Sequence, residues 1–126
     1  MSVAALEFIS KKMQEIGVPY AYGNWEGDLP EDYYCIADGY IEPPSPYKSE
    51  NGHTEATLYL RLYTRKSVLV LEQAKELIEK TFATTAILDD GSAIAIFCDG
   101  ALATPTGDNA WKALKIDLNI QEWRAK

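Results

Sequence analysis

The sequence predicts an α+β domain of two layers, in which two helices pack on one face of a mostly antiparallel sheet. Two segments have helical periodicity, and strand-like segments lie between and after them. The strand-like segments follow one another at short, hairpin-like spacings, which favour antiparallel pairing. Two amphipathic helices can cover only one face of such a sheet. At 126 residues, the chain is interpreted as one domain over residues 1–126.

The first helix is expected over residues 2–17. Ser2 can cap its start, and Gly17 followed by Pro19 ends it, because glycine accepts the left-handed conformation and proline cannot continue a helix. Apolar residues recur at intervals of three and four along one face of this segment: Leu6, Ile9, Met13 and Ile16.

Three segments follow the first helix. Residues 19–32 contain a short extended piece and an acidic turn, and residues 33–42 form an aromatic-rich strand candidate. After a polar, proline-containing loop, residues 53–65 alternate strictly. The side chains expected on the core are Ala56, Leu58, Leu60 and Leu62, and those on the other face include Glu55, Thr57, Tyr59, Arg61 and Tyr63.

The second helix is expected over residues 67–83, with Ser67 as its N-cap and one side lined by Val68, Leu71, Ala74, Ile78 and Phe82. Residues 84–100 indicate two short strands around an Asp-Asp-Gly-Ser turn. Residues 103–112 form a second turn-rich loop. A last strand over residues 113–123 points Leu114, Ile116, Leu118 and Ile120 inward.

Charge limits the function classes. The net charge of −7 argues against a protein that binds nucleic acid by neutralising phosphates, although it is compatible with DNA passing by without adhering. No apolar run is long enough for a membrane span, so no membrane association is expected and a cytoplasmic protein is the default. Cys35 and Cys98 lie far apart in strand-like segments, which favours buried free thiols over a disulfide.

Few residues offer catalytic chemistry. The single histidine, His53, lies at a junction between loop and strand, and no phosphate-binding, nucleophile-elbow or Cys-x-x-Cys motif is present. We therefore expect no enzyme activity, no metal and no cofactor. The alternative is a small hydrolase or ligand-binding domain with paired carboxylates, but the sequence does not select a pair among 19 acidic residues. Stacking of bases on Tyr33, Tyr34 and Tyr40 would need a basic groove beside them, which the sequence does not indicate. Packing of these side chains in the core or in an interface is therefore favoured.

The uncovered sheet face is the unusual surface. Tyr, Trp and Arg are enriched in protein interfaces, and these residue types occur here at Tyr59, Arg61, Tyr63, Arg65 and Trp123. The alternative is that each side chain belongs to an ordinary cross-strand pair on a solvated sheet face. We favour an interface, and hence a subunit of an assembly.

Three runs, SVLVLEQAKELIEK, DDGSAIAIF and ATPTGDNAWKALKIDLNIQEW, resemble the small tail terminator proteins of long-tailed bacteriophages and prophages, also called tail completion or tail-to-head joining proteins. The likeness covers about the last two-thirds of the chain. It implies a homo-oligomeric ring, a hexamer in that family, which caps the tail tube protein and joins the head–tail connector protein. DNA would be only passing cargo. It also implies a place in the host cytoplasm during assembly and then in the tail or neck of the virion. Another neck or minor tail structural protein is the alternative.

The resemblance gives a role to the loop between residues 43 and 52. Pro43, Pro44 and Pro46 stiffen its first half, so docking on a neighbouring ring would cost little conformational entropy. Tyr47, followed by Lys48, is the side chain expected to anchor it. The competing interpretations are an active-site lid and a mobile surface connection.

Overall fold

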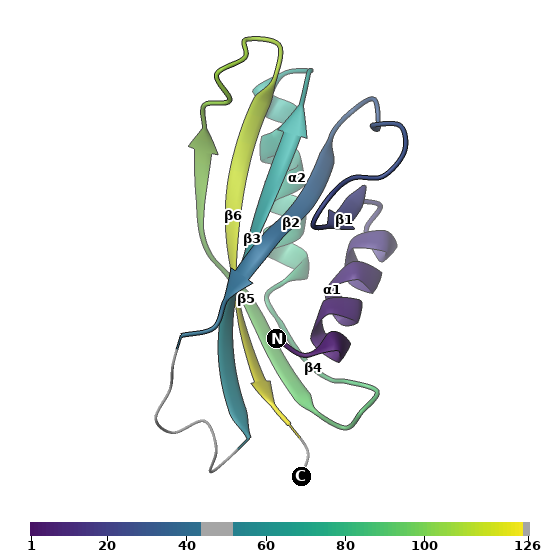
Figure 1. Ribbon diagram of the computed structural model, residues 1–126, viewed down its shortest axis with the longest axis vertical. Helices are drawn as coiled ribbons and strands as arrows, with labels where there is room; N and C mark the ends of the chain where they lie inside the picture. Colours follow the sequence, from purple (N-terminus) through teal and green to yellow (C-terminus); the bar gives the residue numbers. More distant parts are fainter. Residues whose placement is uncertain (44–51, 125–126) are drawn as a thin grey trace.

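The computed structural model describes residues 1–43 and 52–124 (Figure 1). Within these residues it contains two helices and one six-stranded, mostly antiparallel and strongly curled sheet. The α+β class expected from the sequence is therefore confirmed. The elements in chain order are α1 (Val3–Glu15), β1 (Tyr20–Tyr22), β2 (Tyr34–Ile41), β3 (His53–Thr64), α2 (Val68–Thr81), β4 (Thr84–Ile87), β5 (Ala93–Thr104) and β6 (Lys112–Trp123).

The sheet has the strand order β1-β2-β3-β6-β5-β4. Its two central strands, β3 and β6, pair antiparallel over their whole length, from His53 opposite Trp123 to Thr64 opposite Lys112. The exception to antiparallel pairing is β1, which lies parallel to β2. The connection between β1 and β2 contains the acidic turn. It brings the chain back to the end of the sheet where β1 starts, so β2 runs in the same direction as β1.

Both helices begin and end near the positions that the sequence indicates. The Ala5 amide donates to the Ser2 hydroxyl over 3.0 Å, so Ser2 is the N-cap of α1. Ser67 occupies the N-cap position of α2, but its side chain makes no capping hydrogen bond. On the side of α2 expected to be apolar, Leu71, Ala74, Ile78 and Phe82 are buried, whereas Val68 in the first turn is 48% exposed.

The core lies between the helices and one face of the sheet. The registers of β3 and β6 place Leu58 opposite Leu118 and Leu60 opposite Ile116, and all four side chains are fully buried. They form one apolar cluster with Ile9 of α1 and with the buried side chains of α2. Neither helix packs on the opposite face, which we call the outer face.

Strand β5 differs most from the sequence-based expectation. The second of the two short strands expected within residues 84–100 does not end there: Cys98–Gly100 lies inside β5, and the register with β6 shifts between Cys98 and Gly100. A bulge at Asp99 explains this, because one extra residue in a strand bends it without ending it. The strand continues to Thr104, so the following loop is shorter than expected. The edge strand β4 pairs only with Ala93–Ile96, which leaves residues 97–104 without a second partner strand in the described part of the chain.

Two further expectations can be compared with the structure. Cys35 and Cys98 are both free thiols, the first buried and the second half-buried. No helix within residues 1–43 and 52–124 combines the length and apolar content needed to cross a bilayer.

Candidate functional site

The residues expected to form an assembly interface fall into four places. Pro44, Pro46, Tyr47 and Lys48 lie outside the described residues, and Pro43 is exposed just after β2. On the outer face, Tyr59 and Arg61 lie at the centre of β3. Tyr63 and Arg65 lie at its C-terminal end, which is the upper end in Figure 1, and Trp123 lies at the opposite, lower end of the sheet.

The centre of the outer face is occupied by interactions within the chain. Arg61 Nε lies 2.7 Å from the Asp38 carboxylate on the neighbouring strand. Lys115, the register partner of Arg61, reaches diagonally across β3 and β6, and its Nζ lies 4.3 Å from the ring centroid of Tyr59. Here the alternative interpretation, ordinary cross-strand pairs on a solvated face, describes the geometry well.

The upper end of the outer face is different, because aromatic rings gather there. Tyr63 is the register partner of Tyr34, and the two rings stack with centroids 5.3 Å apart. Tyr34 also contacts Trp25 at 5.6 Å and Trp111, edge to face, at 6.0 Å. All four rings are half-buried. We call Trp25, Tyr34, Tyr63 and Trp111 the aromatic cluster.

Turn chemistry positions the two tryptophans. Trp25 lies in the connection between β1 and β2, and its Nε1–H donates to the Asp28 carbonyl over 3.0 Å. Trp111 ends the loop before β6. Its amide donates to the Asp108 carbonyl over 3.1 Å, and its own carbonyl accepts from the Thr106 hydroxyl over 2.9 Å. Local hydrogen bonds therefore hold the Trp25 indole and the Trp111 backbone before any partner is present.

Cations and carboxylates border the aromatic cluster. The Arg65 guanidinium lies 4.6 Å from the Trp111 ring centroid, a cation–π distance. Lys66 and Asp32 form an ion pair at the same end of the sheet. Burial, and then the neighbouring Tyr63, raise the pKa of the Tyr34 phenol, and Arg65 opposes this effect. Tyr34 is therefore a neutral hydrogen-bond donor at physiological pH.

A shallow pocket adjoins the aromatic cluster. It encloses about 400 Å³ and lies between the end of the β1–β2 connection and the turn from β3 to α2. Its lining combines apolar surface with acidic and basic groups, among them Leu29, Pro30, Glu31, Asp32, Lys66 and Trp111. The rings and this pocket together form a half-open, largely apolar surface with a charged border, which suits an extended peptide better than a small polar substrate.

The lower end of the outer face contains a second, smaller aromatic contact. Trp123 stacks on His53 with centroids 4.9 Å apart, and 40% of the Trp123 side chain is exposed. His53 Nε2 lies 3.2 Å from the side-chain oxygen of Gln121, so the histidine has a structural partner. The length of β3 separates this contact from the aromatic cluster, and the two sets of residues do not form one site.

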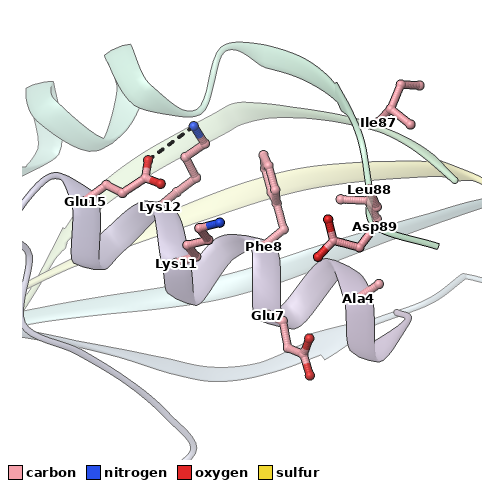
Figure 2. A pocket seen from close by; sticks show the side chains of 9 residues that line it. All are labelled: Ala4, Glu7, Phe8, Lys11, Lys12, Glu15, Ile87, Leu88 and Asp89. Carbon is pink, nitrogen blue, oxygen red and sulfur yellow. Dashed lines mark ion pairs between the residues drawn. The ribbon is translucent and has the colours of Figure 1, made fainter. Parts of the chain in front are cut away.

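A depression on the helix side has little chemistry to offer. Figure 2 shows it between α1 and the turn that joins β4 to β5, with Phe8 between Lys12 and Leu88. It encloses about 300 Å³. Lys12 pairs with Glu15 over 3.4 Å and lies near the Phe8 ring, as on many solvated helix faces. Within residues 1–43 and 52–124, no three His, Cys, Asp or Glu side chains group closely enough to hold a metal ion.

The sequence-based interpretation missed Trp25 and Trp111 as interface residues. Both lie in turn-rich segments, where strand alternation says nothing about the direction of a side chain. The available signal was their composition: a large aromatic residue in a turn rich in Gly and Asp must find partners elsewhere or remain exposed. Comparison with protein-family models finds no match, and comparison with curated proteins finds no significant relative. The chemistry of the outer face therefore carries the functional conclusion.

Proposed function

We propose that this protein is a structural subunit that assembles through the outer face of its sheet. Within that class, the resemblance of its sequence favours a tail terminator of a long-tailed phage or prophage: a ring of identical subunits that ends the tail tube and joins it to the head connector. The proposal includes no catalytic step and no bound cofactor.

The single observation that carries this proposal is the aromatic cluster on a sheet face that neither helix covers. Half-buried Trp and Tyr rings bordered by an arginine are the composition of interface hot spots, where large rings bury area and lose little side-chain entropy.

The free edge of β5 supports the same class of function. Along residues 97–104 the strand has no second partner in the described part of the chain, and Phe97 and Leu102 are 42% and 62% exposed on it. Natural sheets usually shield a long apolar edge, because it can pair with another chain. A subunit that meets neighbours in an assembly has a use for such an edge.

The charge balance is compatible with DNA passing through a ring. Basic groups along a channel would retain phosphates, whereas a net charge of −7 allows an acidic or neutral lining. Tight binding of duplex DNA at near-physiological salt would contradict this part of the proposal.

Deletion of the gene from the phage or prophage that carries it tests the proposal. Electron microscopy of the resulting lysate should show free heads together with free tails or overlong tubes. Supplying the wild-type gene in trans should restore complete virions. A normal virion yield after deletion would refute a role in tail completion. A lysate with intact, joined tails but defective heads or fibres would place the subunit elsewhere in the particle.

A further inference from the structure

We propose that the aromatic cluster of one subunit binds the proline-rich segment, residues 43–51, of a second copy of this chain. The inference rests on the proposed function in one respect, which is that the chain assembles with itself. It adds the residues that receive the contact and the segment that supplies it.

The aromatic cluster has the chemistry of a polyproline-binding surface. Domains that bind such peptides present a row of Trp and Tyr rings, and the proline rings pack between them. Here four rings from four segments of the chain lie side by side on an open face, with nearest centroids 5.3 to 6.0 Å apart. Pro30 and Leu29 extend the apolar surface into the neighbouring pocket.

The segment has the sequence that such a surface recognises. Pro43, Pro44 and Pro46 give it the P-x-x-P spacing, and a sequence of this kind favours the polyproline II helix. That helix has three residues per turn, so Pro43 and Pro46 would lie on one side, about 9 Å apart. Trp25 and Trp111 both contact Tyr34, with ring centroids at 5.6 and 6.0 Å, so the two indoles are separated by no more than the sum of these distances, a range that includes the spacing of the prolines.

Charge on the border of the site complements the segment. Glu31 and Asp32 line the pocket beside Trp111. Asp32 pairs with Lys66, whereas Glu31 takes part in no ion pair among the described residues. Lys48 follows the prolines in the segment, where a basic residue could reach these carboxylates. The border also carries Arg65 and Lys66, and the segment carries Glu50 as well as Lys48, so each side offers both charges to the other.

The segment cannot reach the aromatic cluster of its own chain. It joins the lower end of β2 to the start of β3, whereas the cluster lies at the upper end (Figure 1). On β2, Ile41 next to the segment and Tyr34 in the cluster are seven residues apart, which is about 24 Å at 3.4 Å per residue. Residues 44–51 are fixed at both sides, so the tip of the segment extends at most about 15 Å. The contact must therefore form between copies.

Such a contact joins unlike surfaces. One subunit contributes a segment from the lower end of its sheet, and the next contributes rings from the upper end. This is a heterologous contact, which produces a closed ring or an open chain of subunits rather than a two-fold dimer.

The test uses a synthetic peptide with the sequence of residues 42–51, EPPSPYKSEN, and the full chain with residues 44–51 replaced by a short Gly-Ser turn, which leaves the cluster vacant. The three indole N–H signals are followed by NMR during titration. We expect the Trp25 and Trp111 signals to shift and the Trp123 signal, from the other end of the sheet, to stay. A peptide with Pro43 and Pro46 changed to Ala should bind at least tenfold more weakly.

Binding should also weaken at least tenfold in the Trp111→Ala variant and remain in Trp123→Ala. The proline-substituted peptide keeps the test decisive even where Trp111→Ala fails to fold. No shift at millimolar peptide, or a shift confined to Trp123, would overturn the inference. If the peptide does not bind but gene deletion prevents joining of heads and tails, the proposed function stands without this inference. If the peptide binds but gene deletion leaves virions intact, the contact between copies stands and the proposed role in tail completion is wrong.

Discussion

A buried carboxylate offers a sharp test of how α1 is fixed to the sheet. Glu122, near the end of β6, is 1% exposed and points to the helix side. Its carboxylate accepts hydrogen bonds from the Ser2 hydroxyl and, over 3.2 Å, from the Ser2 amide. Ser2 in turn caps α1. The last strand and the first helix are therefore joined by one charged group at a helix N-terminus.

The change Glu122→Gln keeps the shape of the side chain and removes its charge. A hydrogen bond to a charged group contributes about 1.5–3 kcal/mol and a neutral one about 0.5–1.5 kcal/mol. A negative charge at a helix N-terminus contributes about a further 0.3–1 kcal/mol. Relief from burying a charge offsets part of this loss. We expect Glu122→Gln to lower the free energy of unfolding by about 1–2 kcal/mol, and Tm by roughly 4–8 °C for a domain of this size.

Urea unfolding followed by circular dichroism measures the effect, with Glu7→Gln as the control. Glu7 lies on the exposed side of α1, so its substitution should change the free energy of unfolding by less than about 0.5 kcal/mol. A double-mutant cycle with Ser2→Ala should show a coupling above about 0.5 kcal/mol. Equal stability of Glu122→Gln and wild type, or no coupling, would show that desolvation cancels the interaction and refute the reasoning.

Three further predictions concern other parts of the fold. Burial, and then Glu79, raise the pKa of the Cys98 thiol to about 11, and burial raises the pKa of the Cys35 thiol further. An aromatic disulfide reagent at pH 8 should therefore label Cys98 slowly and Cys35 only after unfolding. Gly52 and Gly107 both have positive φ, +63° and +78°, but an added Cβ would lie 3.0 Å from the Arg124 backbone oxygen at Gly52 and in open space at Gly107. Because only Gly52 has this steric contact, Gly52→Ala should lower the free energy of unfolding in urea by about 1 kcal/mol more than Gly107→Ala does. Leu102→Lys, on the free edge of β5, should reduce self-association in sedimentation velocity and leave Tm unchanged.

The central strands were predictable because one physical rule decides them. From Leu58 to Leu62 in β3 and from Leu114 to Ile120 in β6, every second residue is a large aliphatic side chain, and a shift by one residue would expose all of them. The helices were predictable for a similar reason, since their apolar spacing and the Ser2 cap agree. Local pattern and burial then point to the same structure, and tertiary contacts have little to change.

Prediction failed where one local signal has two structural meanings. The Asp99-Gly100 pair is typical of turns, but the same pair also fits a bulge within a strand, and pairing with β6 decides between them. The aromatic cluster was beyond reach for a different reason. Trp25, Tyr34 and Trp111 are distant in sequence, and only the strand order brings their segments together.

The difference between the two ends of the outer face yields a last prediction, on the symmetry of assembly. A subunit whose residues 44–51 are replaced keeps its aromatic cluster, and a Trp111→Ala subunit keeps its segment. If the contact is heterologous, an equimolar mixture of the two variants can form one such contact per pair and cannot grow further through this site. With Leu102→Lys added to both variants to prevent association through the free edge of β5, sedimentation velocity should then show the mixture as heterodimers and each variant alone as a monomer. Larger species in the mixture, or the same dimer from either variant alone, would show that like surfaces pair and that the segment and the cluster do not meet.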